Sequence, residues 1–108
     1  MLYYEARVAG AIMLLVILNL LDLILTIVNV HYGWAVEANP LLDYFLQNWG
    51  YLGLAGMKFV LIGFGVFVAW EARDYRWILA ALCGLLVVYT AVVLWNLYIA
   101  LAGTVGLL

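Results

Sequence analysis

The chain has 108 residues, of which 71% are hydrophobic and 9% are charged, with a formal net charge of −2 at pH 7. Ordinary soluble domains contain about 25% charged residues, and a small one cannot bury this much apolar surface. The charge balance gives no support to nucleic acid as a partner. The single cysteine excludes an internal disulfide. The composition therefore predicts an all-α integral membrane protein whose first partner is the lipid bilayer.

Three apolar stretches are each long enough to cross the hydrocarbon core, which takes about 20 residues. They cover roughly residues 6–30, 51–70 and 77–100. Backbone polar groups in lipid must be satisfied internally, so we expect each stretch to be a transmembrane helix. We expect residues 1–108 to form one domain, because the sequence has no linker or internal repeat.

A fourth, shorter element is predicted between the first two spans. Asn39 and Pro40 are typical of a helix start, with asparagine as the N-cap and proline at the first helical position. Residues 40–49 then place apolar side chains at helical spacing but are too few to span a bilayer. The pattern predicts a short helix lying in the membrane interface and ended by Gly50.

The basic residues predict the orientation. Arg7 precedes the first span, and Arg73 and Arg76 lie in the short connection between the second and third spans, whereas the long first loop has neither lysine nor arginine. The positive-inside rule then places the N-terminus in the cytoplasm and the C-terminus outside the cell (inner) membrane. The tight turn at 71–76 also predicts that the second and third helices are antiparallel neighbours.

Polar residues occur at similar depths in all three spans. Asn19, Asp22, Thr26 and Asn29 lie along one face of the first span, and Lys58 and Asn96 lie in the second and third. Ionisable groups in a membrane usually pair and face the bundle interior. We therefore predict an Asp22–Lys58 ion pair that is hydrogen-bonded by Asn19 and Asn96. It could serve only to fix helix register, or it could be a functional site.

Small residues mark two faces that suit close helix contacts. Gly53, Gly56 and Gly63 lie near one face of the second span, and Ala80 and Gly84 form a small-xxx-small pair in the third. We expect one of these faces to pack inside the bundle and the other to dock against another subunit.

A resemblance rests on several of these residues taken together. The elements Asn19-Leu-Leu-Asp22, Thr26, Gly33, Glu37-x-Asn39-Pro40 and Lys58 resemble an uncharacterised family of small prokaryotic membrane proteins, domain of unknown function 5658. The resemblance covers roughly residues 10 to 100 and implies a three-helix membrane fold without an assigned activity. It also implies that Glu37, Asn39 and Pro40 form a lid over the ion pair.

Three functions remain open from the sequence. The first is a non-catalytic accessory or structural subunit that docks onto a larger membrane complex. The second is a small homo-oligomeric transporter or channel that uses Asp22, Lys58 and Asn96. The third is a protein that binds a lipid, quinone or pigment. Enzymatic activity is not expected, because the sequence has no serine and its one histidine lies outside the core. No metal and no cofactor are expected either.

Overall fold

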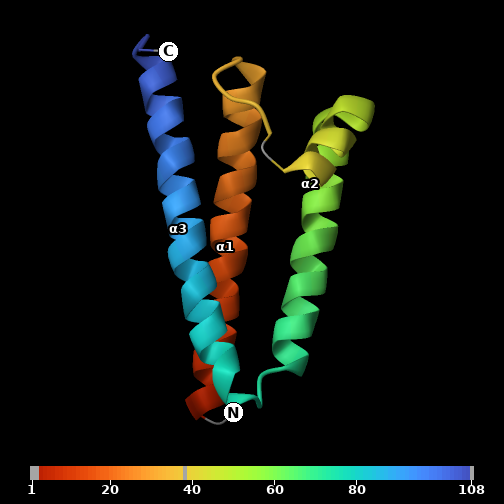
Figure 1. Ribbon diagram of the computed structural model, residues 1–108, viewed down its shortest axis with the longest axis vertical. Helices are drawn as coiled ribbons and strands as arrows, with labels where there is room; N and C mark the ends of the chain where they lie inside the picture. Colours follow the sequence, from red (N-terminus) through yellow and green to blue (C-terminus); the bar gives the residue numbers. More distant parts are fainter. Residues whose placement is uncertain (1–2, 38, 108) are drawn as a thin grey trace.

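The computed structural model describes residues 3–37 and 39–107 and consists of three long helices (Figure 1). They are α1 (Tyr3–His31), α2 (Pro40–Glu71) and α3 (Arg76–Thr104). Each is long and apolar enough to cross a membrane. The molecule is 48 Å in its longest dimension, against about 30 Å for the hydrocarbon core. The all-helical architecture with three long apolar helices that is predicted from the sequence is confirmed, and the helices extend beyond the predicted spans.

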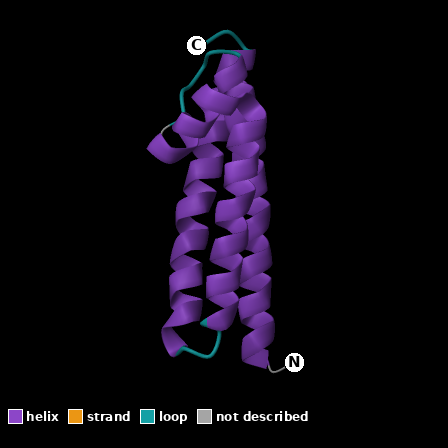
Figure 2. Cartoon of the chain, turned by 90° about the vertical axis from the view of Figure 1, so that its right-hand side faces the viewer, coloured by secondary structure: helices purple, strands orange, loops and turns teal. Residues whose placement is uncertain are grey.

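Helices α1 and α3 run parallel to each other and share most of the contacts between helices (Figure 1). Helix α2 is antiparallel to both, with a smaller contact to α1 and only a weak one to α3. The predicted antiparallel direction of α2 and α3 is therefore confirmed, but the two helices do not pack as close neighbours. The turn between them brings together only their ends and does not determine their packing further along. Figure 2 shows that, within the described residues, the loops between the helices lie at the two ends of the bundle.

The end of the molecule that carries the α2–α3 turn, called here the Arg73 end, has an apolar core between α1 and α3. Its buried residues are Val8, Ala11, Ile12, Ile78 and Leu82. Small and branched side chains from α1 thus meet branched side chains from α3, and this contact explains why α3 packs along α1.

Helix α2 is sharply kinked at Gly50, where φ is 67° and ψ is −156°. This conformation is essentially restricted to glycine. The first arm of α2, residues 40–49, lies beside the start of the second arm, residues 51–71 (Figure 1). The structure therefore does not show the separate interfacial helix that the sequence predicts. It shows a kinked α2 whose two arms pack together at the opposite end, called here the His31 end.

A second buried cluster attaches both arms of α2 to α1. Leu42 of the first arm and Leu54 of the second arm pack with Leu23 of α1. Leu54 is 1% exposed. The first arm is thus held by apolar burial as well as by the kink, and it stands close to the polar residues of α1.

The segment after α1 is fixed to α3. The backbone N–H groups of Trp34 and Ala35 both donate to the carbonyl of Asn29, at 2.8 and 3.2 Å. The Trp34 ring packs so closely on Gly103 that a Cβ atom at that position would overlap it. Trp34 and Ala35 are therefore fixed to the end of α1, and the Trp34 ring also contacts α3.

Candidate functional site

An ion pair joins α1 to α2 inside the His31 half of the molecule. Lys58 Nζ lies 2.9 Å from Asp22 Oδ2, and the two side chains are 9% and 14% exposed. Asn96 of α3 donates its side-chain N–H to the other carboxylate oxygen, Asp22 Oδ1, at 2.6 Å. The predicted ion pair and its bond to Asn96 are both confirmed. One carboxylate therefore connects all three helices.

Asn19 does not join this cluster. Its Nδ2 donates to the carbonyl of Leu15, one turn earlier in the same helix, at 2.8 Å. The prediction that Asn19 hydrogen-bonds the ion pair is therefore wrong. In a helix, an asparagine side chain can donate to the backbone carbonyl four residues before it without any contact to another helix. Asn19 makes this local hydrogen bond instead of one to the Asp22 carboxylate. Asn19 instead lines the groove described below.

Asn29 is a further member of the buried polar set. Its side chain is 1% exposed, and its Nδ2 donates to the backbone carbonyl of Asn96 at 3.0 Å. The seven-residue spacing from Asp22 places Asn29 on the same face of α1, as the sequence predicts. Its position near the helix end gave no signal that it would bridge to α3.

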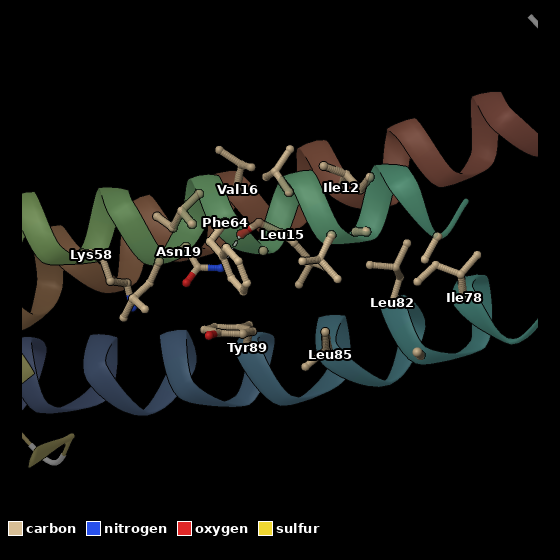
Figure 3. Close-up of a pocket in the computed structure, with 18 of the residues that line it drawn as sticks. Ile12, Leu15, Val16, Asn19, Lys58, Phe64, Ile78, Leu82, Leu85 and Tyr89 are labelled. Carbon is tan, nitrogen blue, oxygen red and sulfur yellow. Dashed lines mark hydrogen bonds between the residues drawn. The ribbon is translucent and has the colours of Figure 1, made fainter. Parts of the chain in front are cut away.

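An apolar groove of about 470 Å³ lies between α2 and the α1–α3 pair (Figure 3). Aliphatic side chains from the three helices form most of its wall, with Phe64 of α2 opposite Tyr89 of α3 in the close-up. Its polar wall residues are Asn19, Asn39, Lys58 and Tyr89. Lys58 Nζ lies 5.8 Å from the centre of the Tyr89 ring, close enough for a cation–π contact. The groove is therefore apolar along its length and polar at the ion pair.

A second cavity of about 450 Å³, called here the polar pocket, lies against the same ion pair. Asp22, Thr26 and Asn29 of α1, Asn96 of α3 and Glu37 of the connecting segment belong to its wall. Lys58 is not part of this wall, whereas Asp22 is not part of the groove wall. The ion pair thus separates two cavities of different character.

The three residues predicted as a lid occupy different places. Glu37 faces the polar pocket, Asn39 faces the groove, and Pro40 is the exposed first residue of α2. Glu37 Oε1 accepts the Asn39 backbone N–H at 3.0 Å. Ala38, between them, lies outside the described residues. Asn39 also caps α2, because its side-chain oxygen accepts the N–H groups of Leu41 and Leu42.

The family model described as Domain of unknown function (DUF5658) matches residues 13–102. The chain belongs to this family. The matched region contains the ion pair, both cavities' polar residues and the kink at Gly50. The comparisons with curated proteins and with solved structures gave no match.

The small-residue faces of this DUF5658 member have different environments. Gly53 packs against the first arm of α2, where a Cβ atom would lie 2.6 Å from both the Phe45 carbonyl oxygen and Trp49 Cβ. Gly56, Gly63 and Gly84 would each have nothing within 4 Å of an added Cβ atom. Ala80, one turn before Gly84, is also exposed. Gly53 thus serves internal packing, and the other small residues remain on the surface of the chain.

Proposed function

We propose that this chain is a non-enzymatic membrane protein that binds an amphipathic, lipid-like molecule in the groove between α2 and the α1–α3 pair. The observation that carries the proposal is the groove's division into a long apolar wall and a polar end at Lys58. Its volume of about 470 Å³ falls within the range of about 300–1,000 Å³ that is typical of small-molecule sites. The apolar part suits a hydrocarbon tail.

The polar end suits a head group that carries acceptor oxygens. The Lys58 ammonium has three N–H donors, and Asp22 accepts one of them. Tyr89, whose hydroxyl is a donor, stands beside it in the same wall (Figure 3). A carboxylate, ester or quinone carbonyl could accept hydrogen bonds from these groups. A lipid, a fatty acid or a quinone would each meet this requirement.

The orientation that we propose is a cytoplasmic N-terminus in the cell membrane, with the Arg73 end inside. It is supported by the position of Arg73 and Arg76 at this end of the molecule and by the absence of lysine and arginine from residues 31–50. The ion pair and the polar end of the groove would then lie in the outer half of the bilayer. The absence of serine from the sequence supports a binding role rather than hydrolysis.

Two leucine substitutions in α2 test the proposal. Gly65 belongs to the groove wall, whereas Gly63 does not, and neither has an atom within 4 Å of an added Cβ. We expect native mass spectrometry of the wild-type protein, purified in mild detergent from its membrane, to show a bound amphiphile. Gly65→Leu should lose it, and the matched control Gly63→Leu should retain it. A wild-type protein without a bound amphiphile, or equal retention by Gly65→Leu, would overturn the proposal.

A second candidate is an accessory subunit that docks onto a larger membrane complex. It is favoured by the exposed surface at Gly56, Ala80 and Gly84, where a helix of another subunit could approach closely. Affinity purification in mild detergent should then yield a stoichiometric partner that Gly84→Leu releases. Purification of a particle that contains only this chain would contradict this second role.

A further inference from the structure

The polar pocket has a wall rich in hydrogen-bond acceptors. Its polar wall residues are Asp22, Thr26, Asn29, Glu37 and Asn96. They include two carboxylates, two side-chain amides and a hydroxyl, and no lysine, arginine or histidine belongs to this wall. The remaining wall is small and apolar apart from the ring of Trp95. Such a wall favours a ligand that brings hydrogen-bond donors.

The Asn29 side chain has a buried oxygen that needs a hydrogen-bond donor. Its Nδ2 is committed to the backbone carbonyl of Asn96, which can only accept, and this bond fixes which way the amide is turned. Its Oδ1 is then buried without a hydrogen-bond partner. Leaving a buried acceptor unsatisfied costs about 1–3 kcal/mol. Because Asn29 is part of the pocket wall, a ligand in the pocket can supply the donor.

The charges around the pocket favour a cation. Asp22 is compensated by Lys58, which approaches it from the groove side. Glu37 accepts the Asn39 N–H, but it makes no ion pair within residues 3–37 and 39–107. One uncompensated carboxylate therefore faces a partly desolvated cavity.

We propose that the polar pocket binds a primary ammonium group, from either a small amine or an aminophospholipid head group. Glu37 would neutralise its charge, and the Asn29 and Thr26 side-chain oxygens would accept its N–H groups. Trp95 also belongs to the pocket wall, and aromatic rings attract cations.

The wall suits an organic cation better than a metal ion. Across the described part of the chain, no group of three or more His, Cys, Asp or Glu side chains is placed to hold a metal. A volume of about 450 Å³ also exceeds what a single ion fills and lies in the range of small organic ligands. The orphaned amide oxygen calls for a hydrogen-bond donor beside the Glu37 carboxylate. The charged group of a primary ammonium provides N–H donors there, whereas that of a quaternary ammonium provides none.

The proposal can be tested by titration followed with NMR of the protein in phosphatidylcholine nanodiscs. The probes are ethanolamine, a primary ammonium, and choline, its quaternary analogue. We expect ethanolamine to give saturable shifts of the Asn29 side-chain amide and the Glu37 carboxylate, and choline to give none. Saturable shifts of equal size with ethanolamine and with choline would overturn the role of N–H donation.

A second arm separates the two sources of the ammonium group. If the ligand is a lipid, nanodiscs of phosphatidylethanolamine should shift the same two signals relative to phosphatidylcholine, even where free ethanolamine does not. A lack of response to both ethanolamine and phosphatidylethanolamine would overturn the proposal.

Glu37→Gln provides the variant test, because it removes the uncompensated charge without altering the α1–α3 contact made by Asn29. We expect Glu37→Gln to raise the Kd of whichever ligand binds the wild type, ethanolamine or phosphatidylethanolamine, about tenfold, which corresponds to roughly 1.4 kcal/mol. The matched control is Asp43→Asn, since the carboxylate of Asp43 lies outside the pocket and contacts Gln47. Equal binding by Glu37→Gln and the wild type would contradict the assignment.

Discussion

Lys58 of α2 and Asp22 of α1 form an ion pair of 2.9 Å at the boundary between an apolar groove and a polar pocket. Lysine contributes to the groove wall and aspartate to the pocket wall, so each charge faces a different cavity. The pair is a salt bridge that joins α1 to α2. It is therefore a structural link whose loss can be measured independently of any ligand.

Removing one charge of this pair should destabilise the protein more than removing both. Asp22→Asn leaves the Lys58 ammonium unpaired in a region where each side chain is at most 14% exposed. Breaking a buried pair in this way costs about 3–5 kcal/mol. The double variant Asp22→Asn/Lys58→Met removes the charge imbalance and should recover part of this loss. The free energy of unfolding in mixed micelles measures both effects.

The control for this comparison is Asp43→Asn, which alters a carboxylate outside the cluster and should change the stability by less than about 0.5 kcal/mol. The single variant Lys58→Met completes the comparison. If the loss of unfolding free energy in the double variant equalled the sum of the losses in Asp22→Asn and Lys58→Met, the two charges would not be coupled. The structural role of the pair would then be refuted.

The backbone conformation at Gly50 predicts that any residue other than glycine will be strained there. Its φ of 67° and ψ of −156° lie in a region that costs other residues about 1–3 kcal/mol. Gly50→Ala should therefore lower the free energy of unfolding by this amount. Gly63→Ala is the control, because Gly63 lies within the regular second arm and has open space around it. Since alanine favours helices, Gly63→Ala should be neutral or stabilising, and an equally tolerated Gly50→Ala would contradict the kink.

Asn39 should contribute to the stability of the first arm of α2. Its side-chain oxygen accepts the N–H groups of Leu41 at 3.0 Å and Leu42 at 3.4 Å. Replacing an asparagine N-cap by alanine costs about 1 kcal/mol. Asn39→Ala should therefore increase hydrogen exchange at Leu41 and Leu42. Asn48→Ala is a fair comparison, because exposed Asn48 only donates to the carbonyl of Tyr44 and caps no helix start.

The sequence predicts much of this architecture because the determining signals are local or periodic. The three spans follow from hydropathy, and the Asp22–Lys58 pair follows from two ionisable residues at equal depth, which can avoid lipid only by pairing. Asn96 was found in the same way. These inferences need only a count of residues along each helix.

The errors concern relations that residue counting does not determine. Asn19 shares a face with Asp22, but whether its amide bonds a neighbouring helix or its own Leu15 carbonyl depends on local geometry. The separation of α2 from α3 depends on how well Ile78 and Leu82 pack with α1. The doubling back of residues 40–49 onto the second arm depends on the absence of a side chain at Gly53. No single-sequence pattern distinguishes this glycine from Gly56.

That pair of glycines gives the sharpest test of the kinked helix. A Cβ atom at Gly53 would lie 2.6 Å from the Phe45 carbonyl oxygen and from Trp49 Cβ, whereas one at Gly56 would meet nothing within 4 Å. Overpacking of this kind costs about 1–3 kcal/mol, so Gly53→Ala should be destabilising. Gly56→Ala should be neutral or slightly stabilising, because alanine is the better helix former. Thermal unfolding of both variants, with Trp49 fluorescence as a local reporter, measures the difference. Equal stability would mean that the first arm does not pack on Gly53, and the polar end of the groove, which includes Asn39, would then have to be placed differently.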